Sequence, residues 1–324
     1  MPLGGAEAKA VVRGIRADLI SGLQSGPKIA EKICYVPTST KRSEEYFVGG
    51  TTAQVREWTD ERVPAEMFET SIIVENKHFE ASLSMHRDDM DDDQVGIYSQ
   101  RARELGIRAS AYEEVRVLKD LIDAAESATG AFGAAYDTQA FFDTDHVDPG
   151  PAEYTTAQDN DTTSNITTPA APTLADLKAA VLDMISNLTL FKDDKGQPWH
   201  IALPNKLIAL VPPSFVNVFN ELNQSQTIAE NAAAITNIWK GSFDIFTNLW
   251  TVSDDRFILI VPGPMSWPFI LQRRLAPRFS QVTGNRSGEL SDDAWNTLFD
   301  KFGVDFRLGV GFAQWRSAIL HTFT

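Results

Sequence analysis

The residues best suited to chemistry stand together in the segment 143–146, where Asp143, Asp145 and His146 occur. Carboxylates and an imidazole at this spacing can reach one divalent cation from a loop, or can exchange a proton with a substrate. A metal-dependent hydrolase that uses these three residues is therefore one hypothesis. The other histidines stand alone and no HExxH pair occurs, so we favour a turn held by side-chain-to-backbone hydrogen bonds.

A second group of carboxylates, the acidic run at 88–93, invites a calcium interpretation. Counted from Asp89 as an EF-hand loop, the sixth position is Gln94 where Gly is required, and the twelfth is Gln100 where Glu is required. The pattern therefore fails. Asp is a good helix N-cap residue and suits the positive end of the helix dipole, so we expect the run to cap a helix.

Other catalytic signatures are missing from the sequence. There is no GxxxxGK phosphate-binding loop, no GxGxxG that opens a helix after a strand, and no GxSxG serine motif. The single cysteine, Cys34, has no base beside it, and it cannot form an intrachain disulfide or a paired-cysteine zinc site. We assign no catalytic, cofactor-binding or metal-ligating residue, and we expect a protein without a cofactor.

Composition narrows the class of protein further. The 324 residues are 43% hydrophobic, enough for a core, and 44 acidic against 29 basic residues give a net charge of −15. This balance argues against a large nucleic-acid-binding surface and against docking on anionic membranes, because both need basic residues. No apolar run is long enough to cross a membrane. One cysteine and the absence of a signal-peptide pattern favour a cytosolic protein, or one released by lysis.

Several predicted elements would position these residues. In the first one, over 1–33, apolar residues recur at helical spacing, and Gly26 and Pro27 end that helical pattern. Strict alternation over 68–74 and again over 79–85 predicts either a hairpin that turns at Asn76 or one long strand bent there. A three–four rhythm over 93–127 predicts a helix of roughly 45 Å, unusually long for a compact domain.

The second half of the chain has a different composition. The segment 148–173 contains seven Thr, four Pro and no Lys or Arg, which is typical of a surface loop. Beyond it, the pattern predicts helices over 174–190, 215–222 and 291–302, strands over 206–211, 243–252 and 256–261, and a closing pair of strands over 302–321.

Two long segments resemble the major head subunit of Mu-like phages and prophages. They are 73–84 (IVENKHFEASLS), running into 91–98 (DDDQVGIY), and 136–146 (YDTQAFFDTDH). The shorter segments 35–41 (YVPTSTK) and 56–62 (REWTDER) support the resemblance. This chain departs from the family at Thr138, where we expect Gly, so the turn after Asp137 is expected to differ.

The resemblance implies the α+β Hong Kong 97-type capsid fold, whose parts follow the order of the elements above. They are an N-terminal arm (1–45), an extended loop (46–90) with its tip near 59–66, a peripheral domain with a long spine helix (91–147), the Thr- and Pro-rich loop (148–173), an axial domain (174–262), and a return to the peripheral domain (263–324). The predicted helix and strands are unusually long, and this fold requires elements of that length.

The resemblance also implies a function, which is that of a major capsid protein and not an enzyme. Such a subunit self-assembles into hexamers and pentamers of an icosahedral phage head, with scaffold and portal proteins as partners during assembly and double-stranded DNA inside. Assembly would occur in the bacterial host cytoplasm, and the protein would reside in the virion. An acidic chain suits this role, because a shell that does not grip phosphates would enclose the DNA without sequence-specific or tight binding. We expect no membrane as a partner.

Near the tip of the extended loop, Arg56, Trp58 and Arg62 are the residues we expect to contact neighbouring subunits. The two arginines would pair with acidic patches on a neighbour. An encapsulin-like nanocompartment shell of the same fold, enclosing enzyme cargo, is the nearest alternative. The metal-dependent hydrolase built on residues 143–146 is the third.

Overall fold

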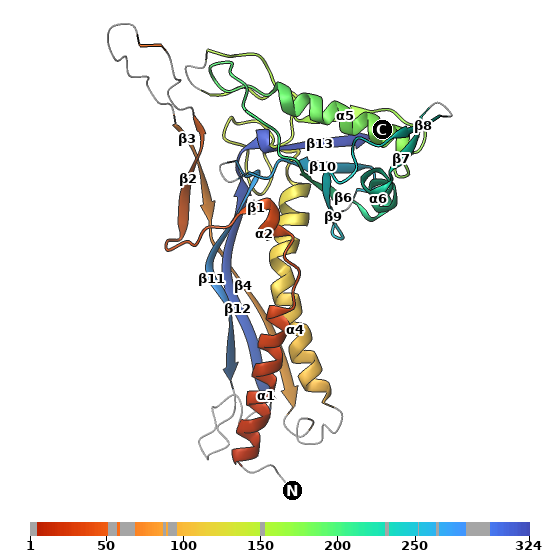
Figure 1. Ribbon diagram of the computed structural model, residues 1–324. Coiled ribbons are helices and arrows are strands. Elements are labelled where there is room, and N and C mark those ends of the chain that lie inside the picture. Colours follow the sequence, from red (N-terminus) through yellow and green to blue (C-terminus); the bar gives the residue numbers. More distant parts are fainter. Residues whose placement is uncertain are drawn as a thin grey trace.

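The computed structural model describes residues 5–50, 57–58, 69–86, 89, 96–149, 153–230, 233–251, 253–263, 266–282 and 299–324. Figure 1 shows an elongated part, in which long strands lie beside two helices, and a more compact part at one end that holds a second sheet. Helices and strands contribute to both parts, so the expected α+β class is confirmed. None of the described helices is long and apolar enough to cross a lipid bilayer.

A four-stranded sheet runs the length of the elongated part, in the order β1-β11-β12-β4. Its strands are β1 (Cys34–Tyr35), β4 (Lys77–His86), β11 (Phe269–Val282) and β12 (Phe299–Phe312). The alternation in β12 buries Phe302, Val304 and Phe306, whereas the residues between them face the other side. Between β11 and β12 the register shifts near Pro277, which has no N–H to donate to the ladder.

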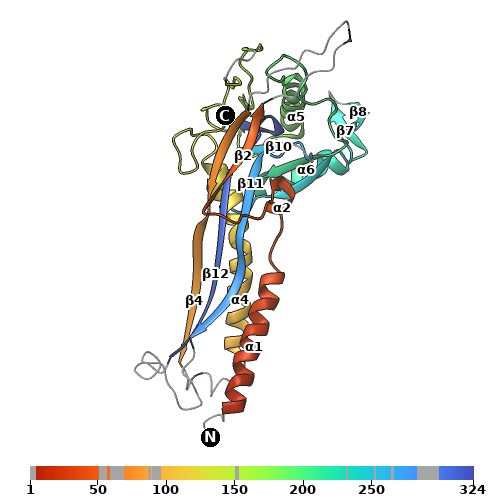
Figure 2. The same cartoon turned by 90° about the vertical axis from the view of Figure 1, so that its left-hand side faces the viewer.

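Two helices, α1 (Gly5–Gln24) and α4 (Ile97–Val115), lie along one side of this sheet (Figure 2). α4 continues into a π-helical segment (Arg116–Leu121), so the expected long helix is confirmed. Added Cβ atoms on Gly22 of α1 and Gly106 of α4 would overlap backbone oxygens of the other helix. The two glycines therefore allow the helices to meet backbone to backbone.

The expected acidic cap of the long helix stays a prediction. The N-cap residue by backbone position is Gly96, at φ +71°. Asp89 is exposed, and the other aspartates of the run lie outside the described residues. Gly adopts this left-handed conformation without steric cost, which explains its place at the helix start.

A separate hairpin of β2 (Ser43–Gly50) and β3 (Glu69–Glu75) stands on the side of the long sheet away from α4 (Figure 1). β3 and β4 follow one another but pair with different strands, so the chain bends at Asn76. The bent strand is thus the correct interpretation and the hairpin at Asn76 is wrong. The Asn76 amide holds the bend by donating to Ser39 Oγ (2.8 Å) and to the Lys41 carbonyl (2.9 Å).

The compact part is built on a five-stranded sheet in the order β5-β13-β10-β6-β9. The strands are β5 (Asp161–Ser164), β6 (Leu207–Val211), β9 (Phe243–Thr247), β10 (Arg256–Ile260) and β13 (Ala318–Phe323). The shorter elements around it are α2 (Ala30–Ile33), a 3-10 turn (Pro213–Phe215), the hairpin of β7 (Thr227–Glu230) and β8 (Ala233–Thr236), and a second 3-10 turn (Trp315–Ser317).

Two helices cover this sheet, α5 (Leu174–Leu190) on β5 and β13, and α6 (Val216–Gln224) on β9. Thr173 and Asp176 form a reciprocal capping box at the start of α5. The predicted helices over 174–190 and 215–222 and the predicted strands over 206–211 and 256–261 are therefore confirmed, within a few residues at their ends. The strand predicted over 243–252 exists as β9 but ends already at Thr247.

Two expectations for the C-terminal region are corrected, and one strand was not predicted. The predicted closing pair is wrong, because β12 lies in the long sheet and β13 in the five-stranded sheet. Residues 299–302 belong to β12 and not to a helix; the rest of the predicted helix over 291–302 lies outside the described residues. The sequence also gave no signal for β11, where arginines and Pro277 interrupt the alternation.

Candidate functional site

The three residues of the metal hypothesis do not converge on one point. His146 is fully buried, with Nδ1 2.6 Å from Asp137 Oδ2 and Nε2 3.1 Å from Asn160 Oδ1. Its ring stacks on Trp315, with 4.1 Å between centroids. Both ring nitrogens of His146 thus have protein partners, and neither is available to a metal ion or a substrate.

Asp143 and Asp145 are likewise used locally. The carboxylate of Asp143 accepts from the Thr144 N–H at 2.7 Å, and that of Asp145 accepts from the Gln139 side chain at 3.1 Å. The hydrogen bond to Asp143 raises the pKa of Asp145. Over the described ranges, no group of three His, Cys, Asp or Glu side chains could hold a metal ion. The segment is a turn with side-chain-to-backbone bonds, as favoured from the sequence.

What lies here instead is a buried polar junction between the two sheets. Asn160 is its centre: its amide donates to the Phe141 carbonyl at 2.9 Å, and its oxygen accepts from the Asp143 N–H at 2.9 Å. The same amide lies 3.3 Å from the Trp315 and Ala318 carbonyls, which precede and open β13. Asn160 therefore ties the 136–146 segment to the end of the chain.

A second half of the junction surrounds Arg316, whose side chain is 1% exposed. The guanidinium donates to Asp148 Oδ2 at 2.6 Å and to the Lys192 carbonyl at 2.9 Å, and it also contacts the Tyr136 hydroxyl. It lies over the ring of Trp315, at 4.1 Å from the centroid. Burial raises the pKa of Tyr136 and keeps its hydroxyl neutral. We call Asp137, His146, Asn160, Tyr136, Asp148 and Arg316 the junction.

Sequence reasoning missed Asn160, Tyr136, Asp148 and Arg316 as partners. No local pattern brings Arg316 to Asp148, because 168 residues separate them. The one available signal was the resemblance over 136–146, which marks this segment without giving it a role. The structure gives the segment a role in packing, since it joins the long sheet to the five-stranded sheet.

Thr138, the departure from the family pattern, lies inside this segment. It has φ +71° and is the one non-glycine residue with positive φ among the described residues. The turn expected to differ is therefore kept in the left-handed conformation that Gly would favour. A β-branched residue is strained in this conformation.

The N-terminal segment is fixed by a different polar cluster, which we call the arm attachment. Arg273 of β11 donates to Glu31 at 2.7 Å and to Glu113 of α4 at 3.0 Å. Glu114, 2% exposed, accepts from the Ala30 N–H at the start of α2 at 2.9 Å. Burial raises the pKa of Glu114. The segment expected as the N-terminal arm is thus attached, at Ala30 and Glu31, to the chain's own long helix and to β11.

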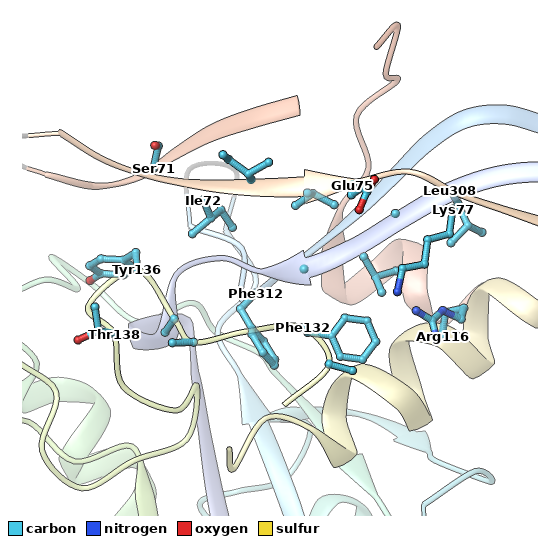
Figure 3. Close-up of a pocket in the computed structure, with 18 residues that line it drawn as sticks. Ser71, Ile72, Glu75, Lys77, Arg116, Phe132, Tyr136, Thr138, Leu308 and Phe312 are labelled. Carbon is cyan, nitrogen blue, oxygen red and sulfur yellow. The ribbon is translucent and has the colours of Figure 1, made fainter. Parts of the chain in front are cut away.

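A groove of about 450 Å³ lies between β3, the loop 131–138 and β12 (Figure 3). Gly309 and Gly311 line it, and side chains there would collide with Val74. Arg116 stands at one end, with its guanidinium carbon 5.0 Å from the centroid of the Phe132 ring and a salt bridge to Asp120. Apolar residues of β3 and β12 line the groove together with the charged residues Glu75, Lys77 and Arg116.

Of the expected contact residues only Trp58, in the segment that connects β2 to β3, is described, and it is 64% exposed. Arg56 and Arg62 lie outside the described residues, so their pairing stays a prediction. The hairpin also exposes Phe47 (68%) and Ile73 (72%). Since Phe47 pairs with Ser71, two residues before Ile73, both side chains project from one face.

This architecture is that of phage capsid proteins of the Hong Kong 97 type. The chain is similar to the capsid of cyanophage P-SCSP1u, with a TM-score of 0.59 at 10% identity over 92% of this chain and 89% of that chain. It is also similar to the procapsid of bacteriophage JBD30, with a TM-score of 0.53 at 20% identity over 99% of this chain and 76% of that chain.

Within that class the sequence is more specific. The family described as Mu-like prophage major head subunit gpT matches residues 8–174, and the chain belongs to this family. It is 33% identical over 141 residues to the major capsid protein of Escherichia phage Mu. The alignment covers 44% of this chain and 44% of that protein, so it spans less than half of the curated relative. The resemblance and the fold expected from the sequence are confirmed.

Proposed function

We propose that this chain is a major capsid protein whose copies assemble into hexamers and pentamers of an icosahedral phage head. The observation that carries the proposal is the hairpin of β2 and β3, which exposes Phe47, Ile73 and Trp58. Large apolar side chains on a projecting element are stabilised when a neighbouring subunit removes them from water. A shell repeats such contacts by symmetry, so many modest contacts sum to a stable assembly.

The partners follow from this role. Copies of the chain itself would be the main partner, scaffold and portal proteins would act during assembly, and double-stranded DNA would fill the finished head. We place assembly in the bacterial host cytoplasm and the product in the virion. The net charge of −15 supports DNA that is enclosed without being tightly bound.

We propose a capsid domain for each group of elements, with two changes from the sequence expectation. We assign residues 1–45 to the arm, the β2–β3 hairpin to the extended loop, α4 to the spine helix and 174–262 to the axial domain. β5 and β13 join the axial strands in one sheet, although they come from the segments 148–173 and 263–324. Because β4 pairs with β12, we assign it to the peripheral domain and not to the extended loop.

Negative-stain electron microscopy after size-exclusion chromatography tests the proposal directly. Shells, tubes or rings of five or six subunits are the expected result, with the scaffold co-expressed if the chain alone stays small. A monomer that persists with the scaffold present would contradict the proposal.

The hairpin contacts are tested by substitution. We expect Trp58→Ala and the charge reversal Arg62→Glu to reduce particle yield, and Trp58→Phe to preserve it, because the aromatic contact remains. Arg56→Glu is expected to act like Arg62→Glu. Normal particles from Arg62→Glu would exclude its ion pair.

A further inference from the structure

Strand β12 has an open side at its C-terminal end. β4 pairs with β12 as far as Leu308, and no described strand continues beside residues 309–312 on that side. The Ala313 N–H donates to a carbonyl group next to β11. Since the direction of the backbone groups alternates along a strand, Val310 and Phe312 turn theirs to the open side. The long sheet can therefore accept a further strand segment there.

β3 also has an open side. Among the described strands it pairs only with β2. The Asn76 N–H donates to the Arg42 carbonyl on the β2 side at 2.9 Å. The alternation therefore turns the backbone groups of Glu75 and Ile73 away from β2. Two strand edges that could accept a partner thus line one groove.

β3 crosses over the face of β12 and does not lie beside it (Figure 3). An added Cβ on Gly309 would come 2.7 Å from the Glu75 carbonyl oxygen. One on Gly311 would come 2.8 Å from a methyl group of Val74. The two glycines therefore let the strands cross in contact, and the groove of about 450 Å³ stays open between β12 and the loop 131–138.

The ladder of β4 and β12 could continue into this groove without a change of register. The first residue of β4 lies opposite Leu308. A straight continuation of β4 would place Glu75 opposite Val310, and two residues further on it would place Ile73 opposite Phe312. At both pairs the backbone groups already have the required direction, because those of β3 turn away from β2 and those of β12 turn to the open side.

A straight β3 would bury an apolar side chain that is now exposed. Paired residues of an antiparallel ladder project to the same face of the sheet. Phe312 projects into the core, where its ring lies 5.1 Å from that of Phe141. Ile73, 72% exposed on the bent strand, would therefore leave the solvent and lie beside Phe312. The removal of its apolar area from water favours the straight strand.

A straight β3 would also change the partner of a carboxylate. Glu75 now pairs with Arg42 at 2.8 Å, and the side chain of Arg42 is 85% exposed. In the straight strand Glu75 would project to the same face as Ile73, toward Arg116 at the end of the groove. Arg116 is mostly buried, and its Nε has no hydrogen-bond partner among the described residues. An ion pair screened by water would thus be replaced by one with a buried guanidinium.

The bent strand has stabilising contacts of its own. The Asn76 amide donates its two bonds to Ser39 and Lys41, and Val74 packs on Ile270 under the hairpin. The Asn76 side-chain oxygen, however, is buried without a partner among the described residues. Each arrangement therefore satisfies groups that the other leaves unsatisfied, which is the condition for an element with two populated states.

From these features we infer that the hairpin of β2 and β3 has a second state, in which the bend at Asn76 straightens and β3 extends β4 along the open side of β12. The switch goes beyond the proposed function, and only its consequence for assembly rests on that function. The bent state presents Ile73 to a neighbouring subunit, whereas the straight state withholds it.

Distances between two spin labels on the unassembled chain test the switch. Phe47→Cys on the hairpin and Ser84→Cys on β4 are both exposed sites, and the buried Cys34 stays unlabelled. Double electron–electron resonance should give a main distance for the bent state and a second one for the straight state, because the hairpin changes its direction relative to β4.

Two substitutions should favour the straight state by independent routes. Gly309→Ala adds a Cβ that collides with β3 in the bent state alone, and Asn76→Ala removes the two bonds that hold the bend. We expect each to raise the ratio of straight to bent chains by about tenfold. Gly303→Ala in the same strand is the matched control: its Cβ would meet no atom closer than 3.3 Å, and the ratio should stay unchanged.

A third substitution tests whether β3 pairs with β12 in the second state. Val310→Pro removes the N–H that faces the open side, and proline is tolerated on an open strand edge. Added to Gly309→Ala, it should remove the second distance. In Gly309→Ala alone, hydrogen exchange of the Phe312 amide should slow down, since the straight state gives this amide an acceptor.

The outcomes separate the switch from the capsid function. One and the same distance in the unaltered chain, Gly309→Ala and Asn76→Ala would overturn the switch and leave the capsid function standing. A second distance that persists with Val310→Pro would show a hinge motion without strand pairing and would also overturn it. A chain that never forms particles contradicts the capsid function alone, because the distances are measured without assembly.

Discussion

The junction and the arm attachment are both polar clusters that join distant parts of the chain, but water reaches them differently. In the junction, His146, Asn160 and Arg316 are at most 1% exposed. In the arm attachment, the side chains of Arg273 and Glu31 are 33% and 35% exposed. A buried polar group that loses its partner has no water to replace it, whereas a half-exposed ion pair is screened and contributes little. The junction should therefore be the fixed connection, and the arm attachment the one that yields first.

The largest expected effect is at Arg316. Arg316→Met leaves Asp148 and the Tyr136 hydroxyl without their charged partner in a buried site, so we expect a loss of about 3–5 kcal/mol in the free energy of unfolding. Urea unfolding of the unassembled chain, followed by tryptophan fluorescence, measures it. Arg278→Met is the matched control: Arg278 pairs with Asp305 at 2.8 Å but is 63% exposed, and it should lose less than about 1 kcal/mol. Similar losses for both would remove the contrast between buried and exposed pairs.

A smaller effect is expected at Glu114, the one deeply buried member of the arm attachment. Glu114→Ala leaves the Ala30 N–H without an acceptor and should cost about 1–3 kcal/mol. Glu114→Gln keeps an acceptor oxygen and removes a charge whose burial raises the pKa, so it should be neutral or slightly stabilising at pH 7. Proteolysis of the N-terminal segment gives a second readout, since faster cleavage in Glu114→Ala alone would locate the loss at the arm. Equal losses in both variants would mean that the charge, and not the hydrogen bond, matters.

The sequence predicts those helices and strands in which apolar residues recur at one regular spacing. The spacing of apolar residues over 174–190 and the short apolar run at 207–211 correctly gave α5 and β6, because each buries one face or both against a neighbour. Strand partners could not be predicted in the same way. β3 and β4 share one alternating pattern yet enter different sheets, and the cause is the bend held by the Asn76 side chain.

The candidate site shows the same limit. Asp143, Asp145 and His146 are residue types that can bind a metal ion, but what they do depends on partners far along the chain, such as Asn160 and Trp315 for His146. Asn160 and Trp315 occupy the positions around His146 that a metal or a substrate would need. Local spacing cannot reveal such partners, and a buried histidine is then satisfied by the core rather than by a ligand.

The next prediction concerns Asp161, which follows Asn160 of the junction in the chain and is only half buried. Its pKa is raised from 3.8 to about 6, chiefly by burial, so the folded state binds the proton more tightly than the unfolded state does. Stability from this group is therefore fully present below about pH 4 and is lost as the pH rises through about 6. Asp161→Asn removes the charge and should stabilise the chain by about 1 kcal/mol at pH 7, a value reduced from the full shift because solvent screens a half-buried group.

Urea unfolding of both proteins at pH 4 and pH 7 measures this effect. The gain at pH 7 should disappear at pH 4, where the carboxyl group is already protonated. Asp176→Asn on the exposed start of α5 is an unsuitable control because it breaks a capping box. Asp254→Asn, in the exposed turn before β10, is a suitable one and should change little at either pH. A gain that persists at pH 4 would come from packing and not from charge.

The smallest expected effect is at Thr138, inside the segment that carries the junction. Replacing it with Gly relieves the left-handed strain of a β-branched residue, about 1–2 kcal/mol, but increases the entropy that the chain loses on folding. The net gain should be about 0.5–1 kcal/mol, seen as a higher unfolding temperature. Thr138→Ala controls for the loss of the side chain, because it removes the branch and keeps Cβ, and it should gain less than Thr138→Gly. If Thr138→Gly is destabilising, then the Thr side chain supports the turn more than its backbone strain opposes it, and the junction tolerates strain because its buried bonds hold the turn in place.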